Sequence, residues 1–328
     1  MENDTNDEKP LISVVIPFKK ATPFLYDCIN ALLNQNVREI EVICIPDAQE
    51  KIEIQDARIT VAIKPGTPSA KRNYGVSIAK SGNIAFIDDD AIPSPNWLEL
   101  GLRDLEKEPV IGGPNIAPAN ENVRRIASDL FLTSVYGSLR EVYRYKPVTN
   151  KKYVDDLLTV NMFVKKGVFV EMGGFDLDLW PGEDTHLSEE LKKAGYNIYY
   201  DPYLFVYHHR REVFRSHLSQ MWRYAKYRGA AIKIGEFKPF YLISSFALIL
   251  APILIVLSIL VSSLIAIFTF GLIPLLSIII FVDYYKRCKS LEGSFLGMLT
   301  VWFSHITYGA GVLYGIFFTN VSTATKSI

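Results

Sequence analysis

Cysteine is scarce in this chain of 328 residues, which has only Cys28, Cys44 and Cys288. The three lie far apart without metal-ligand spacing, and the first two sit in apolar patterns typical of a core, so we expect all three to be reduced and structural. Residues 1–10 are polar and acidic and lack the apolar stretch of a secretory signal peptide. We therefore expect the domain that follows to stay in the cytosol.

Several motifs are also missing. The sequence contains no P-loop, no zinc-type cluster and no internal repeat. Lys and Arg, 35 in all, balance 35 Asp and Glu, so the chain has no net formal charge. We expect no nucleic-acid partner.

Charge is almost absent from residues 240–282. At about 1.5 Å per helical residue, this run is roughly twice the ~30 Å thickness of bilayer hydrocarbon. Ser262 and Ser263 lie near its middle, where we expect a very tight turn between two spans. A further apolar stretch contains four glycines, which let transmembrane helices approach closely. The sequence predicts three transmembrane helices, at about 240–260, 264–283 and 295–318.

The segments beside these predicted spans indicate their orientation. Residues 284–289 and the segment before the first span are basic, so both belong on the cytosolic side by the positive-inside tendency. We expect a multi-pass protein of the cell membrane with a cytosolic N-terminal domain. The alternative is a buried helical hairpin in a soluble protein, although soluble cores rarely use such long uncharged runs. His305, inside the third span, could face a lipid phosphate or another helix.

The first part of the chain alternates strand and helix patterns. Residues 11–17 and 40–45 read as buried strands, and apolar residues at helical spacing lie between them. This order predicts a right-handed βαβ unit in a mainly parallel sheet. Ligands of such sheets bind beyond the carboxyl ends of the strands, which places Pro17, Lys19 and Asp47 on the binding edge.

Three consecutive carboxylates, Asp88, Asp89 and Asp90, follow the predicted strand 84–87. Their mutual repulsion is costly unless a cation neutralises them, although acidic triplets in loops are often only solvated surface. The buried strand before them favours a bound hard cation with oxygen ligands, Mg²⁺ or Mn²⁺, bridging to a diphosphate.

These pieces stand in a characteristic order: SVVIP from Ser13, AKRNYG at 70–75, FIDDD at 86–90, GGFD at 173–176, GED at 182–184 and a His-rich turn. In that order the chain resembles the family 2 glycosyltransferases from about 13 to 229. The resemblance implies an α/β fold of the GT-A type, with a mainly parallel sheet flanked by helices. Many members have a run of two acids and a Gly-Ser turn where this chain has Ile45, Pro46 and Asp47, so only Asp47 remains as a candidate uracil or ribose contact.

The resemblance also implies a set of site residues. Asp184 is the expected general base, taking the proton of the acceptor hydroxyl. The expected donor contacts are Pro17, Asp47, Arg72 and Asp88, and the expected metal ligands are Asp88, Asp90 and His208. Acceptor or diphosphate contacts are expected from Glu183, Trp180, Arg210, Gln220 and Arg223.

Some of these assignments have a plainer alternative. Arg72 could be a surface arginine of its helix, and Glu183 and Asp184 could only favour a helix N-terminus. His208 and His209 could be a surface pair, and which of them faces the metal is open.

The expected organisation is a tail at 1–10, a GT-A catalytic domain at 11–210, a basic amphipathic membrane-interface segment at 211–238 and the helices within 239–320. Residues 220–224 look like the QxxRW element of membrane-bound synthases, with Tyr in place of Trp.

The resemblance implies an inverting transferase that moves a sugar from a nucleotide donor, with UDP expected, to a lipid-linked or membrane-proximal glycan acceptor. A processive polysaccharide synthase, a nucleotidyltransferase and a non-catalytic membrane scaffold are the alternatives. Three spans are few for a polymer channel, and a nucleotidyltransferase needs a triphosphate loop that we do not find. Clustered carboxylates argue against a scaffold.

Overall fold

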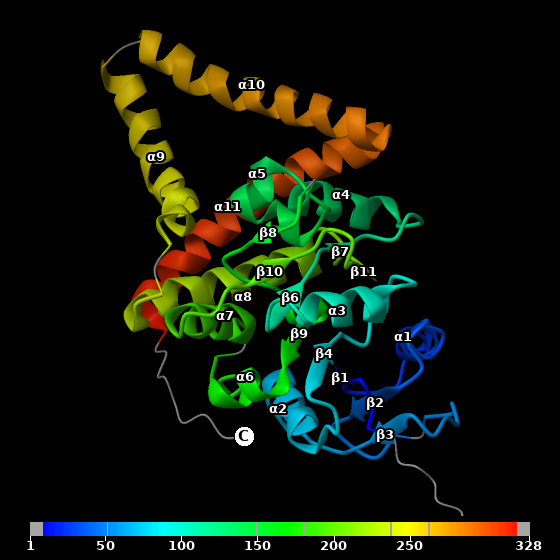
Figure 1. The fold of residues 1–328 in the computed structure, drawn as a ribbon. Helices are drawn as coiled ribbons and strands as arrows, with labels where there is room; N and C mark the ends of the chain where they lie inside the picture. Colours follow the sequence, from blue (N-terminus) through cyan, green and yellow to red (C-terminus); the bar gives the residue numbers. More distant parts are fainter. Residues whose placement is uncertain are drawn as a thin grey trace, which may run out of the picture. The chain divides into compact units, whose positions relative to one another are not determined.

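The computed structural model describes residues 9–50, 52–148, 150–179, 181–236, 238–261 and 263–319, without the side chains of 259 and 261–269 (Figure 1). These residues form two compact units. The first unit holds residues 9–116 and 146–208, and the second holds 117–145 and 209–319. Each unit has a hydrophobic cluster of its own.

The first unit is built on an eight-stranded sheet with the strand order β3-β2-β1-β4-β9-β6-β10-β8. Its parallel half comprises β3 (Ile59–Val61), β2 (Ile40–Ile45), β1 (Ile12–Pro17) and β4 (Asn83–Phe86). The other half comprises β9 (Met162–Lys165), β6 (Val110–Gly112), β10 (Tyr199–Tyr200) and β8 (Lys152–Tyr153). Strand β9 runs antiparallel to both of its neighbours, so the sheet is mixed.

Two strands of the parallel half, β1 and β2, are buried on both faces. Every residue of β1 and β2 is buried, as expected for parallel strands that are covered by helices. The one carboxylate in β2, Glu41, accepts hydrogen bonds from the Ser13 hydroxyl (2.7 Å) and the Lys80 amide (3.0 Å). The strands predicted from the apolar runs are therefore confirmed.

A smaller sheet with the order β5-β11-β7 lies in the same unit. Its strands are β5 (Ala91–Pro93), β11 (Val206–His208) and β7 (Asn115–Ile116). Strand β11 pairs antiparallel with β5 and parallel with β7. Because β5 begins directly after Asp90, the pairing brings β11 to the acidic segment.

Helices α1 and α2 begin with the same local signal. In α1 (Pro23–Leu33) and α2 (Pro68–Ile78) a threonine caps the N-terminus and proline takes the first helical position. Helix α2 packs closely on the sheet, since a Cβ at Gly75 would lie 2.4 Å from Cγ1 of Val15. The remaining helices of the first unit are α3 (Trp97–Leu105), the 3₁₀ turn η2 (Thr159–Asn161), α6 (Lys166–Glu171) and α7 (Glu183–Lys193).

The described elements of the second unit are all helical. They are α4 (Val123–Leu132), α5 (Val135–Ser138), η1 (Leu139–Arg144), α8 (Arg215–Ala231), η3 (Ile232–Ile234), η4 (Pro239–Leu242), α9 (Ile243–Val261), α10 (Ser263–Cys288) and α11 (Leu291–Phe318). Helix α8 packs along α11, where a Cβ at Gly315 would lie 2.1 Å from the Lys226 carbonyl oxygen. Helix α8 lies within residues 211–238, the segment predicted to lie at the membrane interface. In the structure, residues of α8 pack against α11.

A buried histidine joins three helices of this unit. His217 of α8 is fully buried, and its ring nitrogens lie 2.8 Å from the Ser128 hydroxyl of α4 and 2.9 Å from the Ser304 hydroxyl of α11. Burial lowers the pKa of His217 to about 4, so the ring is neutral at neutral pH. A neutral ring donates through one nitrogen and accepts through the other, which satisfies both contacts.

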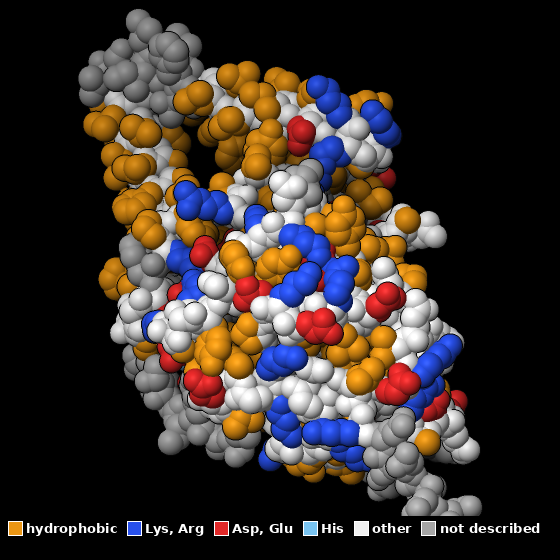
Figure 2. Space-filling model, in the orientation of Figure 1, with side chains coloured by type: hydrophobic (Ala, Val, Ile, Leu, Met, Phe, Trp, Pro, Cys, Tyr) orange, Lys and Arg blue, Asp and Glu red, His pale blue; other side chains and the backbone are white. Residues whose placement is uncertain are grey.

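Apolar side chains cover much of the outer surface of α9 and of the described part of α10 (Figure 2). Two segments, Pro239–Ser258 and Leu291–Phe318, are long and apolar enough to cross a membrane. Helix α10 contains the predicted second span, and Ser262, where the turn was expected, lies outside the described residues. The three-span arrangement stays a prediction.

Candidate active site

Three predicted metal ligands come together in the first unit. Asp88, Asp90 and His208 each offer a ligand atom, and these atoms all lie within 4.8 Å of one another. His208 Nε2 lies 3.1 Å from Asp90 Oδ1, and the three side chains are partly exposed. Carboxylate oxygens with one imidazole nitrogen form a donor set suited to Mn²⁺, and the carboxylates alone suit Mg²⁺.

Strand register explains how His208 reaches the acids across more than a hundred residues. In the β5–β11 pair, His208 lies opposite Ala91, the residue after Asp90. The third acid, Asp89, is not one of these three candidate ligands. Burial, with Asp90 and Asp88 nearby, raises the pKa of Asp89 to about 7.

Arg72 connects the metal group to the start of α7. Its guanidinium is buried, and it donates to Asp88 Oδ1 at 2.7 Å and to Glu183 Oε1 at 3.0 Å. Its Nε is buried without a hydrogen-bond partner among the described residues. Arg72 is therefore not a surface arginine, and it holds two carboxylates in place.

The two acids that open α7 differ in their surroundings. Glu183 is buried, and it is bound by Arg72 and by the Gly182 amide (3.0 Å). The Asp184 carboxylate is half-buried and accepts a hydrogen bond from the Thr185 amide (2.8 Å). Since a general base must reach a substrate hydroxyl, Asp184 suits that task better than Glu183.

At the binding edge, Asp47 is held by a lysine that the sequence pattern did not single out. Lys71 Nζ lies 2.9 Å from Asp47 Oδ1 and donates to the Phe18 carbonyl oxygen, and its side chain is buried. The hydrogen bond from Lys71 is the main cause that lowers the pKa of Asp47. Pro17 ends β1 beside Ile45, next to this group. The only signal for Lys71 was its place in the AKRNYG segment.

Asn73 is a second residue that the motif reading did not assign. Its side-chain amide donates to the Phe175 carbonyl oxygen (2.8 Å) and accepts from the Phe175 amide (2.9 Å). The two preceding glycines, Gly173 and Gly174, have φ of 76° and 73°, a conformation that favours glycine. Asn73 thus fixes the turn of the GGFD motif to α2.

The other predicted contacts lie in the second unit or outside the described residues. Arg210 belongs to the second unit, where it is buried and donates to Asp129 Oδ1 (2.8 Å) and to the Tyr145 carbonyl oxygen (3.2 Å). Gln220 and Arg223 lie on α8, also in the second unit. Trp180 lies outside the described residues.

Comparisons with known proteins indicate the family of the first part of the chain. Residues 13–168 match the profile of Glycosyl transferase family 2. Similar proteins include Glycosyltransferase AglE of Haloferax volcanii, 26% identical over 207 residues, and Pre-mycofactocin glycosyltransferase of Mycobacterium tuberculosis, 26% identical over 237 residues. The alignments cover 58% and 70% of this chain but 64% and 48% of those proteins. The chain therefore spans less than two thirds of the length of either relative.

A solved structure has a similar fold. It is the mannosyltransferase PcManGT from Pyrobaculum calidifontis in complex with GDP-Man and Mn²⁺, with a TM-score of 0.56. The superposition covers 89% of this chain and 87% of that one at 15% identity. This likeness confirms the predicted fold class.

Proposed function

Residues 13–168 belong to glycosyltransferase family 2 with the GT-A fold, and from that premise we propose that the chain is an inverting glycosyltransferase. The observation that carries the proposal is the group of Asp88, Asp90 and His208, joined through Arg72 to the start of α7. The donor would be a nucleotide sugar, and the acceptor a lipid-linked or membrane-proximal glycan. Uracil is the base that the resemblance implies, whereas the similar mannosyltransferase was solved with GDP-Man.

Asp88, Asp90 and His208 would hold a divalent cation, Mg²⁺ or Mn²⁺. Their donor set fits such an ion, and close carboxylates favour one because it relieves their repulsion. When bound, the cation neutralises charge that develops on the leaving diphosphate. Arg72 would keep Asp88 in position beside the cation.

Asp184 would act as the general base. The acceptor oxygen forms a bond to the anomeric carbon while the bond from that carbon to the diphosphate breaks, and the proton of the acceptor hydroxyl passes to the Asp184 carboxylate. Attack opposite to the leaving group inverts the configuration at that carbon. Glu183 supports the site by holding Arg72 in a fixed orientation.

The apolar helices α9, α10 and α11 would anchor the enzyme in the membrane as a multi-pass protein with its catalytic domain in the cytosol. Exposed apolar side chains on α9 and α10 and the two segments long enough to span support this anchor. The basic residues at 284–289 support the orientation.

The proposal is tested on the full chain purified in detergent. Release of the nucleoside diphosphate is measured across UDP- and GDP-linked sugars, with Mn²⁺, with Mg²⁺ and with excess EDTA. We expect turnover of at least one donor that EDTA abolishes, and its loss in Asp90→Asn. Asp155→Asn, which makes the same change in a side chain that is 70% exposed, should leave turnover unchanged. Undiminished turnover in EDTA contradicts the metal site, and no turnover of any donor contradicts the proposed function.

A further inference from the structure

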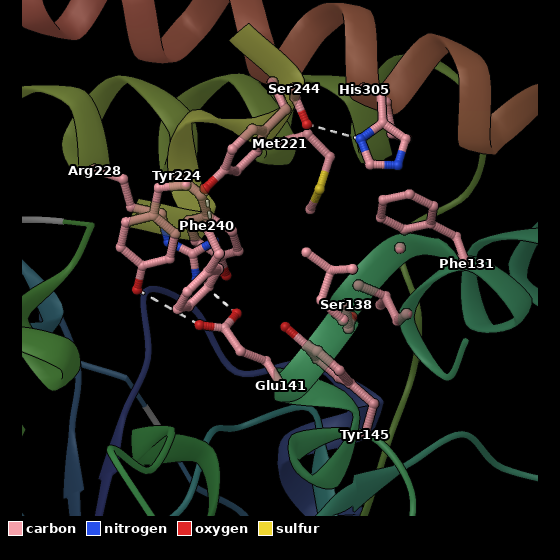
Figure 3. Close-up of a pocket in the computed structure, with 16 residues that line it drawn as sticks. Phe131, Ser138, Glu141, Tyr145, Met221, Tyr224, Arg228, Phe240, Ser244 and His305 are labelled. Carbon is pink, nitrogen blue, oxygen red and sulfur yellow. Dashed lines mark hydrogen bonds and ion pairs between the residues drawn. The ribbon is translucent and has the colours of Figure 1, made fainter. Parts of the chain in front are cut away.

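The second unit contains a cavity that the proposed chemistry does not use (Figure 3). It measures about 70 Å³ and lies among η1, α8, η4, α9 and α11. Phe131, Met221 and Phe240 give it apolar walls, while Glu141 and Arg228 place an ion pair in its lining. A cavity that combines apolar walls with charged groups is suited to an amphiphile.

Arg228 is the cationic group of the cavity. Its guanidinium lies 4.3 Å from the centre of the Tyr241 ring, and Nη1 donates to the Tyr308 hydroxyl at 2.9 Å. Nη2 donates to Glu141 Oε2, also at 2.9 Å. These two hydrogen bonds use two of five N–H donors, in a planar arrangement that matches the oxygens of a phosphate.

Glu141 can release Arg228 without becoming an isolated buried charge. The same oxygen, Oε2, accepts from Nη1 of Arg144 at 2.9 Å. A buried carboxylate that loses every cation is strongly destabilising, but here one arginine remains after the other turns to a ligand. The Arg228–Glu141 contact is therefore exchangeable for a contact between Arg228 and another anion.

The opposite wall offers no competing cation among the described residues. His305 lies 2.6 Å from the Tyr136 carbonyl oxygen through Nε2, so this nitrogen carries the proton and donates. Nδ1 accepts from the Ser244 hydroxyl at 2.8 Å. Both ring nitrogens and this hydroxyl are thus engaged within the wall, which leaves Arg228 as the group that an anion would meet.

The position of the cavity favours a lipid as the source of the anion. Phe240, Tyr241 and Ser244 belong to the beginning of Pro239–Ser258, a segment able to span a membrane. Headgroups lie at the ends of such segments, where tyrosine is enriched. Apolar walls beside the guanidinium would contact the first carbons of a lipid chain.

We propose that this cavity binds the phosphate group of a single phospho-amphiphile, and that the phosphate takes the place of Glu141 on Arg228. Glu141 is an internal competitor, because its carboxylate binds the guanidinium of Arg228 when no lipid is bound. The inference goes beyond the proposed function, because the lipid would bind even if the protein transferred no sugar.

Binding is measured by isothermal titration calorimetry on the full chain in a maltoside detergent, with dodecyl phosphate as the probe. Dodecanol tests whether the alkyl group binds without a phosphate, and inorganic phosphate tests whether the anion binds without an alkyl group. We expect saturable binding of dodecyl phosphate, weaker binding of inorganic phosphate and none of dodecanol at this site.

Two variants of the ion pair should act in opposite directions. Arg228→Lys keeps the charge but loses the planar donors, and should weaken binding by about tenfold, or about 1.4 kcal/mol. Glu141→Gln removes the competitor and should strengthen binding several-fold. Arg215→Lys makes the same change at an exposed position of α8 and should bind as the native chain does.

A purely structural ion pair would give a different pattern, because breaking it from either side would weaken binding or leave it unchanged. That pattern would overturn the proposal. Equal binding of dodecanol would overturn the role of the phosphate, and inorganic phosphate binding as tightly as dodecyl phosphate would overturn the lipid assignment. Thermal unfolding of each variant shows that it is folded before titration.

Discussion

Removing the Arg72 guanidinium should destabilise the first unit as well as stop turnover. Arg72 is 4% exposed and is shared by Glu183, whose side chain is 8% exposed, and Asp88, whose side chain is 30% exposed. In Arg72→Met the apolar stem is kept while both carboxylates lose their cation. Because water already reaches Asp88, most of the cost should come from Glu183.

The size of the effect follows from this burial. Breaking a buried ion pair from one side costs about 3–5 kcal/mol, mainly because a charge is left without its partner. We expect Arg72→Met to lower the free energy of unfolding by about 3 kcal/mol. The double variant Arg72→Met/Glu183→Gln removes the stranded charge and should recover roughly half of that loss. Arg72→Met/Asp88→Asn should recover little.

Thermal unfolding of the full chain in detergent, followed by near-ultraviolet circular dichroism, compares the four proteins. The native chain should have the highest midpoint, with the Glu183→Gln double variant above Arg72→Met. If that double variant were no more stable than Arg72→Met, or if the Asp88→Asn double variant recovered as much, the argument from burial would be refuted.

Three further outcomes are expected. Because the pKa of His217 is lowered from 6.5 to about 4, stability should be complete above about pH 6.5 and should fall by roughly 2 kcal/mol on going to pH 5, a loss that is absent in His217→Gln. Gly315→Ala should lower the unfolding midpoint through contact with α8, whereas Gly271→Ala, where an added Cβ meets nothing within 4 Å, should not. Cys288 should react with a membrane-impermeant maleimide only from the cytosolic face, and labelling only from the opposite face would contradict the predicted orientation.

The parallel half of the sheet was predictable because long, fully buried strands leave an unmistakable apolar run. Strands β1 and β2 have six residues each, and all of them are buried. Strands β8 and β10 have two residues each, too few for any periodicity to appear. The antiparallel course of β9 between β4 and β6 depends on long-range pairing that no local motif encodes.

The residues of the site were likewise predictable where a local motif marks them, whereas contacts between distant parts of the sequence were not. The triplet at Asp88 and the acids that open α7 are local patterns. They predicted a metal site and a general base, but not how these residues are arranged in space. The meeting of His208 with Asp90 follows from the register of β11 on β5, and the link from Arg72 to Glu183 spans 111 residues. The ion pair of Glu141 and Arg228 lay outside every motif, because its residues are 87 positions apart and share no recognisable pattern.

Asp184→Asn tests the proposed transfer most directly. The change keeps the shape of the side chain and removes its basicity, while the metal ligands and Arg72 are untouched. The account predicts that kcat falls by about 10² to 10⁴ while the affinity for the nucleotide sugar, measured by equilibrium titration, stays unchanged. Loss of donor affinity with an unchanged rate at saturating donor would contradict it, and would make Asp184 a donor contact and Glu183 the candidate base.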